Sequence, residues 1–218
     1  HEEGPGQNEI DFRYSSPLAA ADNAMTFQTV VKTVARRNGL VADFGPKPLE
    51  GKPGNGFHIN MSVKSSDDTD NMEFMIAGIL AKISDMTVFL NPLESSYERF
   101  GNHKAPRYIT WSSENRSQLV RIPAAVGEYR RAELRSPDPS ANTYLAFALM
   151  IYASLYGIQN KLELQAPTDI NLYKADIETL ARFEPLPGDL NSACIVAKKS
   201  DFIREHIPDA ILDIYCNR

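Results

Sequence analysis

The sequence predicts an α+β fold, in which helices pack against strands that each have one polar and one apolar face. Three observations lead to this prediction. Apolar and polar residues alternate in short segments such as 57–63 and 130–135, which is typical of half-buried strands. Apolar residues recur every three or four positions in 23–37 and 70–90, which is typical of helices with one buried face. The apolar stretch 144–156 is too short to span a membrane and predicts a buried helix.

The first elements of the chain are expected to be a strand and a helix. Strict alternation over residues 7–14 predicts a half-buried strand with an apolar face of Ile10, Phe12 and Tyr14. A helix is then predicted from Asp22 or Asn23 to Arg37, with its stop at Asn38-Gly39. Its predicted core stripe consists of Met25, Val30, Val31 and Val34.

A second strand and a second helix follow a Pro/Gly-rich loop at 47–56. The strand 57–63 places apolar residues on one face and His58, Asn60 and Ser62 on the other. The helix begins between Asp67 and Asp70 and ends before Asn91-Pro92. Its predicted core stripe consists of Met72, Met75, Ile76, Ile79, Leu80 and Ile83.

The second half of the chain begins with a long polar loop at 91–107, of the length that often forms a lid or a binding loop. A strand at 108–113 leads into the charged stretch 115–123, and another strand is predicted around 130–135. A buried helix is predicted at 141–156, capped by Ser140 and ended by Gly157. Residues from 160 onward are expected to be mainly structural, with short helical segments at 175–182, 189–206 and 209–215.

Composition narrows the classes of function. The 218 residues carry a net charge of −5 and a pI near 5.4, which argues against nucleic acid as a main partner. No apolar run is long enough to predict a membrane partner. Two cysteines, Cys194 and Cys216, are too few for a disulfide framework and predict a cytoplasmic location. The chain begins with His1 rather than methionine, so we expect it to be a piece of a longer protein.

Charged residues on the polar faces of three predicted strands indicate a functional site. Glu9 lies on the first strand, His58 on the second, and Arg131, Glu133 and Arg135 on the third. Carboxylates and a histidine suit a divalent cation such as Mg²⁺ or Mn²⁺, and arginines suit phosphate or carboxylate oxygens. Together these residues predict metal-assisted phosphoryl transfer. The alternative interpretation is a solvated edge strand, which is what most charged strand faces are.

Four motifs in order along the chain resemble the glutamine synthetase family. They are His1-Glu2 through Gly6-Gln7-Asn8-Glu9-Ile10, then Gly54-Asn55-Gly56-Phe57-His58, then Asn115-Arg116-Ser117 through Arg121-Ile122-Pro123, and finally Glu133-Leu134-Arg135-Ser136-Pro137-Asp138-Pro139-Ser140-Ala141-Asn142. Residues 1–218 resemble part of the family's C-terminal catalytic domain, most strongly over 1–173, with 174–218 as a helical C-terminal part. The resemblance implies a curved antiparallel sheet backed by helices, similar to that of guanidino kinases, and a small β-grasp domain before residue 1.

The resemblance also implies two metal sites, each holding Mg²⁺ or Mn²⁺. Glu2 and Glu9 look like ligands of the metal that activates the substrate site. His58 and Glu133 look like ligands of the metal that sits among the nucleotide phosphates.

Further residues resemble the family's substrate and nucleotide contacts. Gly54 falls where a loop backbone contacts the amino-acid substrate, and Arg99 and Arg116 resemble arginines that hold the substrate carboxylate or the transferred phosphate. Ser62 aligns with a nucleotide contact. The phosphate and carboxylate cage is matched by Arg121, Arg131 and Arg135. By this resemblance the catalytic residues are Arg99, Arg116, Arg121 and Arg135, and the ATP-binding residues are Ser62, Arg121 and Arg131.

The implied reaction joins glutamate and ammonia with ATP as co-substrate. The side-chain carboxylate of glutamate attacks the terminal phosphate of ATP, and ammonia then displaces phosphate from γ-glutamyl phosphate. The partners implied are these small molecules and further copies of the protein, arranged in a homo-oligomeric ring with active sites between subunits.

The chain departs from the family pattern in three ways. A Glu-x-Glu strand that gives each metal one more carboxylate would lie before residue 1, as would the domain that supplies an acid to a neighbouring ammonium site. We therefore expect residues 1–218 alone to be inactive. Lys104 stands where the family places a flap glutamate, which accepts a proton from ammonium. Either the flap aligns differently and Glu94 or Glu98 serves instead, or the acceptor is not ammonia. Glu128 stands where a basic nucleotide contact is usual.

Three hypotheses about function follow. The first is a glutamine synthetase or a close homologue, and the second is a γ-glutamyl-amine ligase of the same family that uses a polyamine or another larger amine, which Lys104 supports. The third is a non-catalytic structural relative. Because an unused site of buried charges is a stability liability, the retained acids and arginines argue against the third hypothesis.

Overall fold

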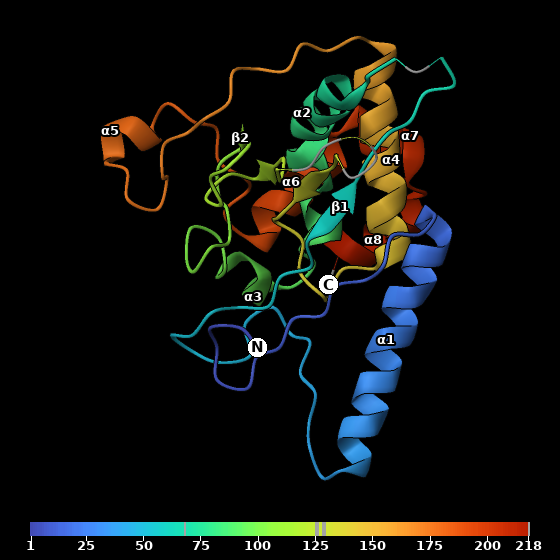
Figure 1. The fold of residues 1–218 in the computed structure, drawn as a ribbon, viewed down its shortest axis with the longest axis vertical. Coiled ribbons are helices and arrows are strands. Elements are labelled where there is room, and N and C mark those ends of the chain that lie inside the picture. Colours follow the sequence, from blue (N-terminus) through green and yellow to red (C-terminus); the bar gives the residue numbers. More distant parts are fainter. Residues whose placement is uncertain (68, 125–126, 128–129, 218) are drawn as a thin grey trace.

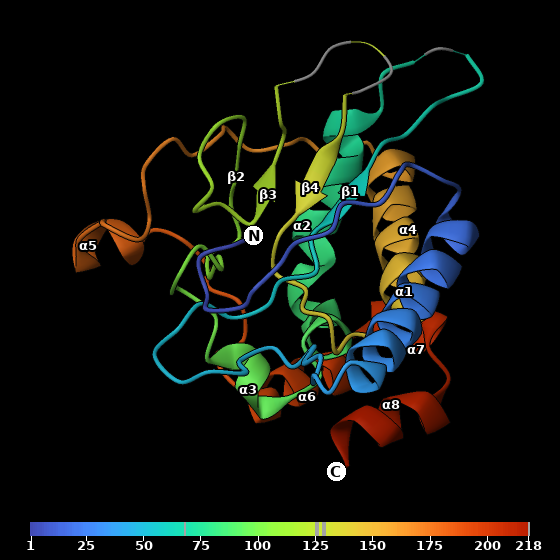
Figure 2. The same cartoon turned by 60° about the horizontal axis from the view of Figure 1, so that its bottom comes forward.

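The computed structural model describes residues 1–67, 69–124, 127 and 130–217, and it confirms the α+β prediction (Figure 1). Glu128 lies outside the described residues. Within them, four short strands form one mixed sheet in the order β1-β4-β3-β2. Figure 2 shows these strands side by side, with helix α2 behind them. The molecule therefore has a sheet layer with a helical backing.

The sheet is built around β4 (Ala132–Leu134), which pairs antiparallel with β1 (Ile59–Met61) and with β3 (Val120–Arg121). The fourth strand, β2 (Trp111–Ser112), pairs with β3 in parallel, so one of the three pairings departs from the antiparallel pattern. Glu133 lies directly opposite Asn60 on one side and Arg121 on the other. Cross-strand neighbours share a face, and the polar faces predicted for two separate strands therefore meet at Glu133.

The core is formed by the sheet and by two long helices, α2 (Met72–Leu90) and α4 (Thr143–Gln159). The predicted stripe of α2 is buried except for the half-buried Leu80, with Met75, Ile76 and Ile83 at 1% exposure or less. Four more helices, besides α1, surround this core: α3 (Glu94–Tyr97), α6 (Leu190–Lys199), α7 (Asp201–His206) and α8 (Asp209–Cys216). A short helix, α5 (Ile177–Leu180), lies apart from them (Figure 1).

Helices α2 and α4 cross at two glycines. A Cβ atom on Gly157 would lie 2.0 Å from the backbone oxygen of Phe74, and one on Gly78 would lie 2.1 Å from that of Ala153. The prediction that Gly157 ends α4 is wrong, because the helix continues to Gln159 and uses Gly157 for close packing. The predicted cap Ser140 is also wrong. The N-cap is Asn142, whose side-chain oxygen accepts hydrogen bonds from the backbone N–H groups of Tyr144 and Leu145 at 3.1 and 3.2 Å.

Residues 7–14 do not form the predicted strand. No strand pairs with them among the described residues, and Ile10 and Tyr14 are 57% and 87% exposed. Alternation provides an apolar face, but a strand also needs a neighbour for its N–H and C=O groups. Phe12 alone of the predicted face has an aromatic contact, an edge-on approach to Phe27 with ring centroids 5.3 Å apart.

Helix α1 (Pro17–Arg37) begins earlier than predicted and buries a different face. Proline at the first position favours this start, and Gly39 with φ +70° follows the last turn as predicted. The buried residues are Ala21 and Ala24, which lie toward α4, whereas most of the predicted stripe is exposed: Met25, Val30 and Val34. Small residues allow a close approach between helices, and this contact determines which face is buried.

The rest of the predicted elements need smaller corrections. The long loop 91–107 contains the short helix α3. The segment 189–206 is two helices that meet at Ser200, whose hydroxyl accepts a hydrogen bond from the N–H of Ile203 and caps α7. No helix among the described residues is long and apolar enough to cross a membrane.

Candidate active site

Glu133 forms the centre of a buried cluster of charges on the sheet. Its carboxylate accepts a hydrogen bond from Arg121 Nε at 2.6 Å and from Arg135 Nη1 at 3.2 Å, and His58 Nδ1 lies 3.3 Å away. Glu133 is 6% exposed. Burial by itself raises the pKa of this carboxyl, but hydrogen bonds from His58 and Arg121 and the charge of Arg135 outweigh it and lower the pKa well below its usual value. Glu133 is therefore ionised at neutral pH.

This geometry excludes the alternative interpretation of the charged segment 130–135 as a solvated edge strand. Strand β4 lies between β1 and β3, and all three of its residues are buried. The predicted alternation places Glu133 and Arg135 together, with Arg135 only 4% exposed. Arg131, at the start of this run, donates from Nε to Asn60 Oδ1 at 3.1 Å.

His58 is held as a neutral imidazole beside Glu133. Burial is the main cause that lowers the pKa of His58, and the positive charges of Arg135 and Arg99 lower it further. Glu133 acts in the opposite direction and raises this pKa, but its effect is smaller. A neutral ring keeps a lone pair on one of its two nitrogens. Nδ1 is the nitrogen that lies 3.3 Å from Glu133 Oε1, so it is the one that could share a cation with this carboxylate. A Cβ atom on Gly56 would lie 2.9 Å from Nε2, so glycine leaves the ring room to keep this orientation.

Glu2 and Glu9 form a second acidic pair. A hydrogen bond with the Glu2 side chain is the main cause that raises the pKa of Glu9, followed by burial and by the negative charges of Glu2, Asp11 and Glu133. Two carboxyl groups that share a proton are stabilised in the ionised form by a cation.

These two pairs fit a divalent cation by donor type. Among the described residues, no group of three or more histidine, cysteine, aspartate or glutamate side chains converges on one point. Mg²⁺ commonly takes one or two protein carboxylates and completes its shell with waters and substrate phosphates. His58 with Glu133, and Glu2 with Glu9, are consistent with this arrangement. Their assignment as metal ligands remains a prediction.

Arg99 lies beneath the site rather than on its surface. It is 3% exposed, and its guanidinium donates to the carbonyl oxygens of Ser136 and Pro137 at 3.0 and 3.3 Å, with Asp138 Oδ2 3.7 Å away. Burial is the main cause that lowers its pKa. These contacts hold Arg99 as a support for the backbone after β4, and its predicted role in substrate binding is untested.

Gly54 belongs to the loop that lies over Arg99. A Cβ atom on Gly54 would lie 2.4 Å from the Pro46 carbonyl oxygen and 2.8 Å from Arg99 Cγ. Its own carbonyl oxygen accepts a hydrogen bond from Gln7 Nε2 at 3.0 Å. The loop is therefore packed between the N-terminal segment and Arg99, and only glycine fits at this position. Ser62, the predicted nucleotide contact, is exposed just beyond β1.

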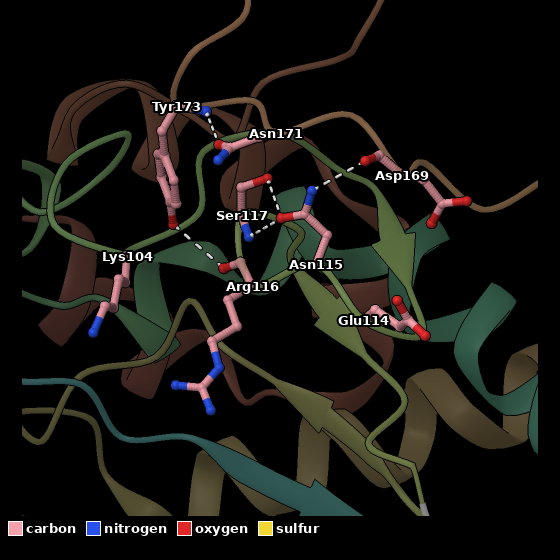
Figure 3. A pocket seen from close by; sticks show the side chains of 8 residues that line it. All are labelled: Lys104, Glu114, Asn115, Arg116, Ser117, Asp169, Asn171 and Tyr173. Carbon is pink, nitrogen blue, oxygen red and sulfur yellow. Dashed lines mark hydrogen bonds between the residues drawn. The ribbon is translucent and has the colours of Figure 1, made fainter.

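Figure 3 shows a polar cavity of about 510 Å³. It is linked to the Glu133 cluster through Lys104, whose carbonyl accepts a hydrogen bond from Arg135. Arg116 is on the cavity wall, separate from the other predicted arginines. The cavity is lined by Lys104, Glu114, Asn115, Arg116, Ser117, Asp169, Asn171 and Tyr173. The sequence singled out Lys104 and Arg116, and Asn115 and Ser117 belong to one of the family motifs. Glu114 and Asp169 lie on loops and were not predicted.

The segment 165–173 is fixed across the start of β2 and β3 by hydrogen bonds. Ser112 Oγ donates to Asp169 Oδ1 at 3.0 Å, Gln118 Nε2 donates to the Ile170 carbonyl at 2.8 Å, and the N–H of Leu172 donates to Ser117 Oγ at 3.0 Å. The Tyr173 hydroxyl reaches the Arg116 carbonyl at 3.5 Å (Figure 3). Burial raises the pKa of Tyr173 to about 12, although the positive charges of Arg135 and Arg99 lower it. The phenol therefore lies between the cavity and the buried arginines.

Lys104 connects the cavity to the N-terminal segment. Its Nζ lies 2.5 Å from Glu3 Oε1, and both side chains are about half exposed, at 47% and 51%. The backbone of Lys104 has φ +69°, and His103 has φ +44°, which is the left-handed region that non-glycine residues rarely occupy. The Lys104 carbonyl accepts a hydrogen bond from Arg135 Nη2 at 3.3 Å.

The fold places an ionised acid among arginines on one face of a sheet, beside a polar cavity. The profile "Glutamine synthetase, catalytic domain" matches residues 1–218. The chain is 42% identical to the glutamine synthetase of Methanosarcina mazei and 41% identical to that of Thermotoga maritima, over 99% and 98% of its length. The chain belongs to the glutamine synthetase family.

Solved structures agree with this assignment. The structure titled "GmaS/ADP complex-Conformation 1" superposes with a TM-score of 0.82 at 28% identity, covering 94% of this chain and 51% of that one. "Apo GmaS without ligand" gives a TM-score of 0.80 at 29% identity, covering 93% and 50%. The chain spans 52% of the length of both glutamine synthetases named above.

Proposed function

We propose that the protein containing this chain is an ATP-dependent ligase that forms glutamine from glutamate and ammonia through γ-glutamyl phosphate. The observation that carries the proposal is the ionised Glu133, which Arg121, Arg135 and His58 surround on one sheet face. Family membership and the relatives named glutamine synthetase support it. The similarity to a structure titled as an ADP complex supports a nucleotide site.

The residues present suit phosphoryl transfer from ATP to a carboxylate. Such reactions are catalysed mainly by positioning and by neutralising charge on phosphate oxygens. Glu133 holds Arg121 and Arg135 by hydrogen bonds, and in this proposal the two arginines would contact the transferred phosphate, with Arg131 bonded to Asn60 nearby. In this proposal the carboxylate of glutamate attacks the terminal phosphorus, the bond to ADP breaks, and ammonia then displaces phosphate from the acyl carbon.

Divalent cations complete the proposal. Glu133 with His58, and Glu2 with Glu9, would hold Mg²⁺ or Mn²⁺ and so supply positive charge for the phosphates of ATP. Each pair supplies two protein ligands among the described residues, so we expect residues 1–218 alone to be inactive. A homo-oligomeric ring and a cytoplasmic location belong to the same proposal.

A second candidate is a γ-glutamyl-amine ligase that uses a larger amine than ammonia. Lys104 favours it, because a protonated lysine at the edge of the cavity does not attract ammonium as a carboxylate would. The cavity of about 510 Å³ also exceeds the space that one ammonia molecule needs.

One experiment tests both candidates. The full-length protein is incubated with ATP, Mg²⁺ and glutamate, and phosphate release is followed with ammonium, hydroxylamine or organic amines as acceptors. Release with ammonium supports the glutamine synthetase, and release with larger amines alone supports the amine ligase. Equal inactivity with every acceptor contradicts both candidates and favours a non-catalytic relative.

A further inference from the structure

Two cysteines lie at a contact between helices at the edge of the core. Cys194 is on α6 and Cys216 is in the last turn of α8, and both are free thiols. Cys194 is buried, at 8% exposure, and Cys216 is half-buried beside the same core cluster. Helices α6 and α8 pack together at the bottom of Figure 2. The two cysteines therefore belong to one helix–helix contact.

The backbone around Cys216 is held by two side chains of α6 that are one helical turn apart. The Cys194 thiol donates to the carbonyl oxygen of Tyr215, with 3.8 Å between the two atoms, and this carbonyl belongs to the peptide unit that leads into Cys216. Lys198 donates from Nζ to the carbonyl oxygen of Cys216 itself at 3.4 Å, and to Asn217 Oδ1 at 2.7 Å. Residues at this spacing lie on the same side of a helix. These contacts hold Cys216 next to Cys194.

The two thiols also interact with each other. The pKa of Cys216 is raised to about 12, first by burial and second by a hydrogen bond with the Cys194 side chain, although the positive charge of Lys198 lowers it. The thiolate, not the thiol, is the form that attacks a disulfide. Because nearly all of Cys216 is protonated at neutral pH, the pair is stable as two thiols and reacts slowly with an oxidant.

We propose that Cys194 and Cys216 form a reversible disulfide under sustained oxidising conditions, and that this bond is a redox-sensitive staple that fixes α8 to α6. In a reducing environment the pair remains as two thiols. The inference is independent of the proposed ligase reaction, because it involves no residue proposed for catalysis or binding.

Helix α8 is the element that the bond stabilises. Leu212 is its buried residue, whereas Ile214 is 62% exposed. The ring of Tyr215 packs on Phe89 of α2, with ring centroids 4.8 Å apart. A helix with so little buried surface separates from the core at low cost in free energy. A covalent bond to α6 closes a loop of roughly 20 residues and prevents this separation.

The oxidant in this proposal is a low-molecular-weight disulfide such as oxidised glutathione. The Cys216 thiol, the more exposed of the two, gives its proton to water, and the thiolate attacks one sulfur of the oxidant. The S–S bond of the oxidant breaks, and one glutathione thiolate leaves and takes up a proton. Cys194 then loses its proton and attacks the Cys216 sulfur, and the second glutathione leaves in the same way. Two protein thiols are oxidised and one glutathione disulfide is reduced to two thiols.

Oxidation of the full-length protein tests the proposal. The native protein is incubated with oxidised glutathione, the remaining thiols are blocked with iodoacetamide, and peptides are identified by mass spectrometry. We expect a pair of peptides joined through Cys194 and Cys216, which dithiothreitol separates. The unfolding temperature should rise by about 5 °C or more, and amide hydrogen exchange in 209–216 should slow by about tenfold or more. Separate glutathione adducts on the two cysteines, or unmodified thiols after prolonged oxidation, would overturn the inference.

Serine variants then assign the effect to this pair. Cys194 is buried, so Cys194→Ser places a hydroxyl in the core and lowers stability by itself. Cys216→Ser, at the half-buried position, therefore carries the test. Oxidation should leave the unfolding temperature of both variants unchanged. A Cys216→Ser protein that gains as much on oxidation as the parent would contradict the inference, as would a parent protein that forms the Cys194–Cys216 bond without any rise in unfolding temperature.

Discussion

The Glu133 cluster and the polar cavity contain similar side chains in opposite situations. In the cluster, Glu133, Arg121 and Arg135 bond to one another and are mostly withdrawn from water. In the cavity, Glu114 and Arg116 are exposed and make no side-chain bond among the described residues. The cluster stands on strands β3 and β4 and at the ends of β1 and β4, whereas the cavity is formed by loops.

In the proposed ligase, the two regions would have separate tasks. Charges that are already paired and buried keep their positions when a ligand arrives, which suits the part of a reaction that is common to every substrate. Charges that are free and hydrated reorganise around whichever molecule enters, which suits the choice of substrate. The buried charges are also the ones whose removal costs folding free energy.

The largest expected difference between the two regions is in stability after one acid is neutralised. Glu133→Gln should lower the free energy of unfolding by about 3 kcal/mol or more, because it leaves the buried Arg135 and the half-buried Arg121 without their counter-ion. Glu114→Gln should change it by less than about 0.5 kcal/mol, since Glu114 is exposed and unpaired among the described residues. Urea denaturation followed by circular dichroism measures both values. Similar losses for the two variants would remove the distinction between the regions.

An intermediate difference is expected for the arginines. Arg121→Ala removes the 2.6 Å hydrogen bond to Glu133 and should cost about 2 kcal/mol of unfolding free energy. Arg116→Ala should stay within about 0.5 kcal/mol of the parent chain. The same denaturation assay compares them, and a larger loss at Arg116 would show that the cavity wall is part of the folded framework.

The smallest of the three effects is the pH dependence that Glu133 confers. Its folded-state pKa is below the ordinary value of 4.5, so its stabilisation is complete above that pH and declines as the pH falls toward the folded-state pKa. The stability gap between the parent chain and Glu133→Gln should therefore shrink by about 1.4 kcal/mol for each pH unit below 4.5. Denaturation at pH 7 and pH 3.5 measures the gap. A gap that is constant over this range would contradict an ionised Glu133 in the folded state.

Periodicity predicted the elements whose environment is set by their own sequence. The stripe of α2 was correct because apolar residues at helical spacing had a single core to face. The segment 7–14 had equally clear alternation, but its strand depended on a neighbour that the pattern does not contain. The prediction of which face of α1 is buried was wrong for a related reason. The contact with α4 buries Ala21 and Ala24 rather than the larger apolar side chains.

The cluster was predictable in part, whereas the cavity was not. Alternation placed Glu133 and Arg135 on one face and His58 and Asn60 on another, and the register of β1 and β4 brought these faces together. Arg121 was found through the family resemblance and lies where the cluster needs a donor. Glu114 and Asp169 stand on loops 55 residues apart, a distance that no local pattern spans. Arg99 is buried because its guanidinium donates to backbone carbonyls after β4. This burial could not be predicted from the sequence pattern either.

The crossing of α2 and α4 at Gly78 and Gly157 bears on any attempt to engineer a more heat-resistant form of this domain. Alanine is favoured over glycine inside helices by about 1 kcal/mol, so both positions would be natural first choices for replacement. Here each added methyl carbon would be placed about 2 Å from a backbone oxygen of the facing helix, and the two helices would have to separate. The sheet that carries Glu133 rests on this helical layer, so such a replacement would reach the site without touching any of its residues.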